Sequence, residues 1–157
     1  MKIAVGSDHA GFQLKGKILQ WLKSAGHEVE DVGTYTGERC DYPDFAKPVA
    51  ERVSRGQVDR GVLVCGSGIG MSIAANKFFG VRAAECFNVP SAEVSRAHND
   101  ANILCLGERM IGEETAKSIL ETWLATAFEG GRHIPRLEKI KQLERENLKV
   151  ILGDSKR

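Results

Sequence analysis

Short apolar segments alternate with longer amphipathic segments along the first 127 residues. The apolar, β-branched segments span residues 2–6, 28–32, 61–65, 81–86 and 103–106, and the amphipathic ones span 12–25, 44–55, 69–77, 91–98 and 113–127. This order predicts five successive βα units. Strands joined by helical crossovers run parallel with right-handed connections. The sequence therefore predicts an α/β fold, a three-layer α/β/α sandwich around a five-stranded parallel Rossmann-like sheet, with ligands bound beyond the strand C-termini.

One further helix is predicted over residues 135–150, with no strand after it. Leu137, Ile140 and Leu143 form an apolar stripe at i, i+3, i+6 spacing, and two glycines precede the helix. Such a stripe is buried either on its own sheet or on a second subunit, and the glycine hinge makes exchange with a partner easy. We interpret residues 1–150 as a single domain and 151–157 as a tail whose last four residues fray.

The composition fits one soluble domain. The chain has 157 residues, 42% of them hydrophobic and 27% charged, which excludes a disordered or fibrous protein. A net charge of +1 offers no basic surface for nucleic acid or an anionic membrane, so neither is expected as a partner. The N-terminus lacks an apolar signal segment and the four cysteines form no CxxC pair, so we expect reduced thiols in a cytoplasmic protein.

The loop after the third predicted strand carries the most informative motif, Cys65-Gly66-Ser67-Gly68-Ile69-Gly70. Successive backbone N–H groups of a glycine-rich loop can surround a phosphate or an oxyanion and favour an ionised thiol. The alternative is a glycine turn beside an inert cysteine. Met71 stands where a dinucleotide-binding motif needs its third glycine and where a cysteine phosphatase needs its arginine, and a P-loop lysine is lacking, so these three classes are disfavoured.

Polar residues follow or precede other predicted strands. Asp8 and His9 follow the first strand, where they either face the ligand crevice or serve as a helix cap and a turn residue. His98 and Asn99 close the fourth helix. They either bind sugar hydroxyls or act as a cation at the helix end and a left-handed helix stop.

Three arginines are candidate phosphate ligands. Arg132 and Arg136 are four residues apart at the start of the last helix and can direct two guanidinium groups at one phosphate, and Arg109 after the fifth strand can join them. Each is otherwise a solvated surface residue. No His, Cys and carboxylate cluster has metal-ligand spacing, so neither metal nor cofactor is expected. Cys40, Cys86 and Cys105 have no glycine loop beside them and are interpreted as structural.

Over residues 1–145 the chain resembles the sugar-phosphate isomerase family that includes ribose-5-phosphate isomerase B and the galactose-6-phosphate isomerase subunits. The resemblance is carried by GSDHAG at 6–11, CGSGIGMSIAANK at 65–77, AHNDAN at 97–102 and GGRH at 130–133. It implies metal-free aldose–ketose isomerisation of a sugar phosphate through an enediolate, with D-ribose 5-phosphate converted to D-ribulose 5-phosphate in the pentose phosphate pathway. A six-carbon substrate such as allose 6-phosphate and a non-catalytic sugar-phosphate-binding protein are the alternatives.

The resemblance also implies roles for individual residues and an assembly. It makes Cys65 the base, and Ser67 and the glycine-rich loop bind the reacting oxygens. It assigns ring opening to the region of His98 and Asp8, and contacts with the sugar hydroxyls to Asn99. The implied residues are Cys65, Ser67, His98 and Asp8 for catalysis, Gly66, Gly68, Ile69, Gly70 and Asn99 for the sugar, and His9, Arg109, Arg132 and Arg136 for the phosphate. The family further implies a homodimer or homotetramer with shared active sites, in which His98, Asn99 and Arg109 come from the neighbour of the chain that supplies Cys65.

Overall fold

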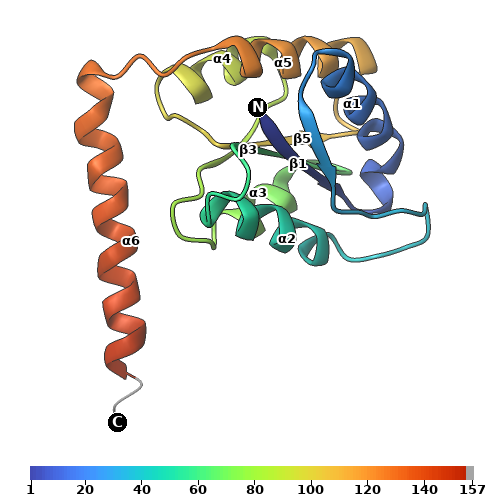
Figure 1. Cartoon of the computed structure of the whole chain (residues 1–157). Coiled ribbons are helices and arrows are strands. Elements are labelled where there is room, and N and C mark those ends of the chain that lie inside the picture. Colours follow the sequence, from blue (N-terminus) through green and yellow to red (C-terminus); the bar gives the residue numbers. More distant parts are fainter. Residues whose placement is uncertain (155–157) are drawn as a thin grey trace.

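The computed structural model describes residues 1–154, and Figure 1 shows helices packed on both faces of a central sheet and the last helix extending away from it. The predicted fraying of the chain end falls partly on residues 155–157, which lie outside the described residues. The strands are β1 (Lys2–Ser7), β2 (Glu28–Asp31), β3 (Arg60–Cys65), β4 (Ala83–Glu85) and β5 (Ile103–Gly107). The helices are α1 (Phe12–Ser24), α2 (Tyr42–Ser54), α3 (Ile69–Ala75), α4 (Val89–Ala97), α5 (Glu113–Ala125) and α6 (Ile134–Asp154), with short 3₁₀ turns η1 (His9–Gly11) and η2 (Gly131–His133).

All strand pairs of the sheet are parallel, in the order β2-β1-β3-β5-β4, which confirms the predicted fold class. Side chains of β3 alternate between two hydrophobic layers. Val62 and Val64 pack in the layer covered by α1, α4 and α5, whereas Leu63 and Cys65 pack in the layer covered by α2 and α3. This alternation follows from the period of two along a strand. The chain after β1 leads to α1 on one face of the sheet, and the chain after β3 leads to α3 on the other.

Several element boundaries differ from the predicted ones for local reasons. The fourth strand is shorter because β4 is an edge strand that pairs only with β5, over three residues. The fourth helix starts at Val89 because the Asn88 side chain accepts the Ser91 N–H and Ser91 completes a capping box. The last helix continues through Asp154, so the helix includes the first part of the predicted tail.

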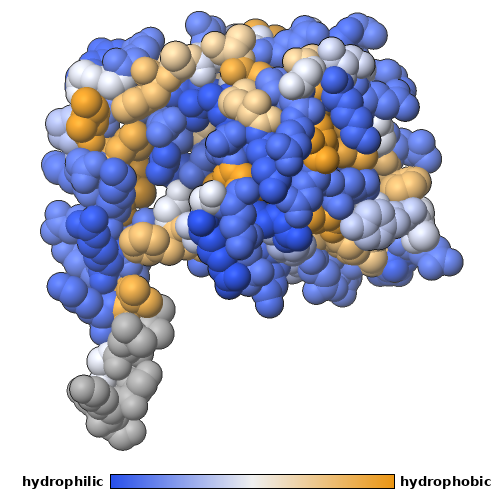
Figure 2. Space-filling model, in the orientation of Figure 1, coloured by the Kyte–Doolittle hydropathy of each residue, from blue (hydrophilic) through white to orange (hydrophobic). Residues whose placement is uncertain are grey.

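The last helix, α6, extends away from the body of the molecule (Figure 1). Of its predicted apolar stripe, Leu137 is buried, whereas Ile140 and Leu143 are exposed. Figure 2 shows hydrophobic side chains along this helix. A hydrogen bond from Gly80 N–H to the Glu144 carboxylate, at 3.1 Å, joins α6 to the loop after α3. Most of the stripe is therefore left unburied by its own chain.

Candidate active site

Cys65, the last residue of β3, is 4% exposed, and the glycine-rich loop turns around its thiol. The Gly68 N–H donates to Cys65 Sγ at 3.1 Å, and the Ile69 N–H donates to Ser67 Oγ at 3.3 Å. Gly68 has φ +84°, and a Cβ there would lie 3.1 Å from the Leu106 carbonyl carbon, so only glycine fits this turn. The loop thus directs one backbone N–H donor at the Cys65 sulfur.

A cavity of about 390 Å³ lies next to this thiol. Its walls come from the loops after β1, β3 and β5 and from the start of α2. Because the loops after β1 and β3 lead to helices on opposite faces of the sheet, this is the switch point at which ligands of such folds bind. The cavity is lined by Asp8, His9, Ala10, Tyr42, Cys65, Gly66, Ser67, Gly70, Arg109 and Met110.

Asp8 and His9 both reach this cavity, and both also hold the local backbone. One oxygen of the Asp8 carboxylate accepts the N–H groups of Ala10 at 2.9 Å and Gly11 at 3.1 Å, so the predicted capping contact is present. The Nδ1 atom of His9 lies 3.1 Å from the Cys40 carbonyl oxygen and 3.3 Å from its amide nitrogen. His9 is therefore anchored to the loop between β2 and α2 and is not a free turn residue.

Arg109 lies in the same cavity as the Cys65 of its own chain. Its backbone N–H donates to the Gly66 carbonyl at 3.0 Å. Its side chain lies beside Gly66, because a Cβ added there would be 3.4 Å from Arg109 Cδ. The expectation that Arg109 comes from a neighbouring chain is therefore wrong. It failed because a residue two positions beyond β5 is brought to the C-terminal edge of the sheet by the parallel pairing of β5 with β3.

Tyr42 is a cavity residue that the sequence analysis missed. It is the first residue of α2, and its ring covers Gly70 so closely that a Cβ there would lie 2.7 Å from the Tyr42 ring. An aromatic side chain at the start of a helix after a strand was the available signal. Nothing in the sequence indicated that it would reach the loop after β3.

The buried thiols of Cys86 and Cys105 differ from Cys65 in their surroundings. Burial raises the pKa of Cys86 and raises the pKa of Cys105 well above its usual range. Neither lines the Cys65 cavity. These two cysteines are packed as small apolar side chains, which fits the structural interpretation of both.

A second cluster of polar residues surrounds His98. Its imidazole stacks on that of His133, with ring centroids 4.3 Å apart and planes 11° from parallel. The Glu129 carboxylate lies 3.9 Å from Nε2 of His98 and 3.6 Å from Nε2 of His133. A backbone hydrogen bond from the Glu129 N–H to the Ala97 carbonyl, at 3.0 Å, holds these segments together.

The two predicted phosphate ligands of the last helix belong to this second cluster. Arg132 Nε donates to Nε2 of His133 at 3.3 Å, and Arg136 Nη1 lies 3.4 Å from its Nδ1. The two guanidinium groups thus converge on one ring, although Arg132 is in η2 and helix α6 begins only at Ile134. Burial, together with the neighbouring His98 and both arginines, lowers the pKa of His133.

The side chains of His98, Glu129 and His133 place three potential metal-ligand atoms within 4.8 Å of one another. The sequence did not indicate this group, because 35 residues separate the two histidines. The group does not fit a cation well. Two guanidinium groups lie against His133, and Arg132 already donates to the Nε2 atom that would bind the metal. Their positive charge suits an anion such as phosphate.

The helix end before β5 also differs from the prediction in one residue. The residue with a left-handed backbone is Asp100, with φ 45°, so Asn99 is not the left-handed stop. Asn99 is exposed, and its side chain lines a second cavity, beneath α6. His98 caps the end of α4, where a cation is favourable.

The two clusters lie at opposite edges of the sheet. Cys65 and Arg109 are at the C-terminal ends of β3 and β5, whereas His98 and Asn99 precede the N-terminal end of β5. The five residues of β5 alone span about 16 Å at roughly 3.3 Å per residue. Within one chain, the structure therefore does not bring His98 to Cys65.

Comparison with known proteins places this chain in a class of sugar isomerases. The profile of the Ribose/Galactose Isomerase family matches residues 3–140, and the chain belongs to that family. Ribose-5-phosphate isomerase B of Escherichia coli is 52% identical over 143 residues, which cover 91% of this chain and 96% of that protein.

Two further relatives show how far the similarity extends. The solved structure of Clostridium thermocellum ribose-5-phosphate isomerase B superposes with a TM-score of 0.92 at 53% identity, covering 94% of this chain and 99% of the other. D-erythrulose-4-phosphate isomerase of Pectobacterium atrosepticum is 44% identical and covers 93% of this chain and 97% of its own length. Among the described residues, no helix combines the length and apolarity needed to span a membrane.

Proposed function

We propose that this protein interconverts D-ribose 5-phosphate and D-ribulose 5-phosphate without a metal, with Cys65 as the base. The observation that carries the proposal is the Cys65 thiol at the wall of a cavity of about 390 Å³, with the Gly68 N–H directed at its sulfur. The family and the relatives named as ribose-5-phosphate isomerases support the reaction class. The free thiols of all four cysteines fit the reducing cytoplasm that we propose as its location.

The chemistry starts from the open-chain aldose. The Cys65 thiolate takes the proton from C2, and the electron pair of that C–H bond forms the C1–C2 double bond of an enediolate with negative charge on O1. The O2 proton then passes to O1 while the thiol returns its proton to C1, which leaves a carbonyl at C2. Ser67 also lines this cavity, and its hydroxyl hydrogen-bonds these oxygens.

The proposed phosphate ligands come from both polar clusters. His9 and Arg109 line the Cys65 cavity, and the guanidinium groups of Arg132 and Arg136 converge in the His98 cluster. A phosphate dianion binds arginine pairs through charge-assisted hydrogen bonds. Both groups serve one substrate only if the two clusters are brought together.

A second copy of the chain can supply the missing half of the site. His98, proposed for opening the sugar ring with Asp8, lies at the opposite edge of the sheet from Cys65 of the same chain. Exposed Ile69 and Ile73, one helical turn apart on α3, adjoin the Cys65 loop, and most of the apolar stripe of α6 is unburied. We therefore propose a homodimer, or a pair of dimers, in which the His98 cluster of one chain completes the Cys65 cavity of the other.

Sugar phosphates of other chain lengths compete with ribose 5-phosphate as the preferred substrate. A relative 44% identical to this chain is named an isomerase of D-erythrulose 4-phosphate, so a four-carbon substrate lies within the range of the family. A six-carbon phosphate such as allose 6-phosphate is a further alternative. The chain length of the substrate depends on the distance between Cys65 and the phosphate ligands of the assembled site.

Proton NMR in deuterium oxide tests the proposal directly. The protein is incubated with ribose 5-phosphate, erythrose 4-phosphate or allose 6-phosphate, and the products are followed over time. We expect ribulose 5-phosphate to form fastest and to carry solvent deuterium at C1, because a proton on a thiol exchanges with solvent. Binding without turnover would instead indicate a sensor protein, and release of inorganic phosphate would indicate a phosphatase.

A further inference from the structure

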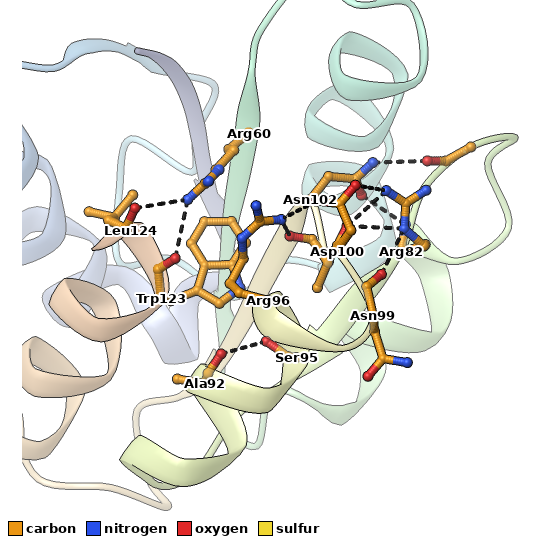
Figure 3. Close-up of polar contacts among 12 residues, drawn as sticks. Arg60, Arg82, Ala92, Ser95, Arg96, Asn99, Asp100, Asn102, Trp123 and Leu124 are labelled. Carbon is orange, nitrogen blue, oxygen red and sulfur yellow. Dashed lines mark hydrogen bonds and ion pairs between the residues drawn. The ribbon is translucent and has the colours of Figure 1, made fainter. Parts of the chain in front are cut away.

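The loop that carries His98 and Asn99 is held by two arginines around the side chain of Asp100 (Figure 3). Arg82 Nη2 donates to Asp100 Oδ2 at 2.9 Å, and Arg96 Nη1 donates to Asp100 Oδ1 at 2.8 Å. Each carboxylate oxygen thus has its own guanidinium partner. The Arg96 side chain is buried, so this part of the network is shielded from water.

The same arginines hold the backbone of the loop. Arg82 Nε lies 3.0 Å from the carbonyl oxygens of Asn99 and Asp100, and Arg96 Nη1 donates to the Ala101 carbonyl at 2.6 Å. Three successive carbonyl groups therefore point at guanidinium groups that Asp100 keeps in place. Because these groups fix the path of the chain, they also fix where the adjoining His98 and Asn99 side chains begin.

Asp100 also adopts an unusual backbone conformation for its residue type. Its φ of 45° makes it the one residue other than glycine with positive φ within residues 1–154. The chain just after α1 and just after α2 turns through Gly26 and Gly56, both with positive φ. Glycine is the usual solution at such positions, so an aspartate after α4 indicates that its carboxylate is needed there.

The network reaches the second segment of the His98 cluster through a tryptophan. The guanidinium of Arg96 lies over the Trp123 ring at 5.7 Å, and that of Arg60 lies over the same ring at 5.0 Å. Arg60 Nη1 also donates to the carbonyls of Trp123 and Leu124 near the end of α5 (Figure 3). The segment after α5 leads to Glu129, Arg132 and His133. The start of that segment and the His98 loop are thus attached to one stack, in which Trp123 and Arg96 are buried and Arg60 is partly buried.

We propose that Asp100 is a positioning residue for the His98 half of the active site. Its carboxylate, bound between Arg82 and Arg96, holds the loop after α4 so that His98 and Asn99 meet the substrate in a reactive geometry. Asp100 itself does not touch the reacting atoms. The inference rests on the proposed function, because it requires that His98 and Asn99 act on the sugar.

Two substitutions separate the charge of Asp100 from its backbone conformation. Asp100→Asn keeps the shape and tolerates positive φ but removes the charge, and Asp100→Gly suits the backbone and removes the side chain. We expect both to lower kcat/KM for ribose 5-phosphate by about 10- to 100-fold, as small displacements of reacting groups do. Parental kcat/KM in both variants would overturn the proposal.

The control variant is Glu30→Gln. Glu30 also lies between two cations, with Arg52 Nε at 2.7 Å and Lys2 Nζ at 3.8 Å, and its side chain is 35% exposed compared with 36% for Asp100. It lies on β2, which pairs only with β1, and it belongs to neither polar cluster, so Glu30→Gln should keep parental kcat/KM with a similar change in Tm. Equal loss of activity in this control and in the Asp100 variants would assign the effect to stability alone and overturn the positioning role.

A double-mutant cycle shows whether Asp100 acts through His98. In a His98→Ala background, Asp100→Asn should lower the residual kcat by a clearly smaller factor than in the parent, because only Asn99 of the two groups that it positions remains. The same fold loss in both backgrounds would show independent action and overturn the proposal. If the parent protein does not isomerise ribose 5-phosphate, or if His98→Ala keeps full activity, the proposed function fails. If the parent protein isomerises ribose 5-phosphate, His98→Ala loses activity and the Asp100 variants keep parental kcat/KM, this inference alone fails.

Discussion

Cys65 and His98 stand at opposite ends of two neighbouring strands. Cys65 is the last residue of β3, whereas His98 precedes β5, whose first residue, Ile103, pairs with Gly61 at the other end of β3. Both side chains lie in polar clusters with charged or donor groups directed at them. In a shared active site each chain would present two half-sites of this kind, at opposite edges of one sheet.

Substitution of Cys65 by alanine should abolish isomerisation and leave the fold intact. General base catalysis contributes about 10²- to 10⁴-fold, so kcat should fall by at least this range in a coupled assay of ribulose 5-phosphate. Cys86→Ala is the matched control, since that thiol is buried in the hydrophobic core and lies outside the Cys65 cavity. A Cys65→Ala enzyme within about threefold of the parent would contradict the role of Cys65 as the base.

Removal of the Arg132 or Arg136 side chain should selectively weaken binding of the phosphorylated substrate. A charge-assisted hydrogen bond contributes about 1.5 to 3 kcal/mol, so each alanine variant should lower kcat/KM for ribose 5-phosphate by roughly 10- to 100-fold. Arg145→Ala, an exposed position on the same helix, serves as the control. Equal losses on ribose and on ribose 5-phosphate would show that these arginines do not bind the phosphate.

Mixing two inactive variants should restore activity if the site is shared. When Cys65→Ala and His98→Ala chains are unfolded together and refolded, about half of the dimers should be mixed, and each mixed dimer has one intact site of two. The expected recovery is therefore about a quarter of parental activity. Mass spectrometry of the intact dimers checks that the chains exchanged. Mixed dimers without recovered activity would place Cys65 and His98 in one chain's site.

Chelation should leave the activity unchanged. The only group of potential metal ligands found among the described residues, His98 with Glu129 and His133, has two guanidinium groups against it. These charges oppose a bound cation. We expect parental kcat after dialysis against EDTA and no gain on adding zinc or magnesium. Loss of activity on chelation, restored by one of these metals, would contradict the metal-free mechanism.

Acid should destabilise the protein through His133. Burial and the cationic neighbours lower its pKa from the ordinary value of 6.5, so below that pH the unfolded chain binds a proton that the folded chain does not. Its contribution to stability is therefore complete above pH 6.5 and decreases as the pH falls toward the lowered folded-state pKa. We expect a His133→Asn variant to lose less free energy of unfolding between pH 7 and pH 5, measured by urea denaturation. An unchanged pH dependence would mean that His133 does not contribute.

The elements that follow local patterns could be predicted well from the sequence. Apolar runs of four to six residues and helical spacing defined the five βα units, because burial of one face imposes a period on each element. The glycine spacing after Cys65 likewise identified a loop able to surround a thiol, since positive φ at Gly68 is a local requirement. The order of the strands, β2-β1-β3-β5-β4, was not predicted, because the rules for parallel connections allow several orders.

Contacts between distant segments required the tertiary structure. His98, Glu129 and His133 meet although 35 residues separate the first from the last, and Tyr42 covers Gly70 from a different helix. No periodicity relates such positions, because their distance depends on how α4, α5 and η2 pack. The same packing decided that Arg109 stays beside Cys65 and that two arginines hold Asp100. Local spacing in the sequence determined the strands, the helices and the chemistry of the Cys65 loop. Long-range packing alone decided that His98, Glu129 and His133 gather at the opposite edge of the sheet.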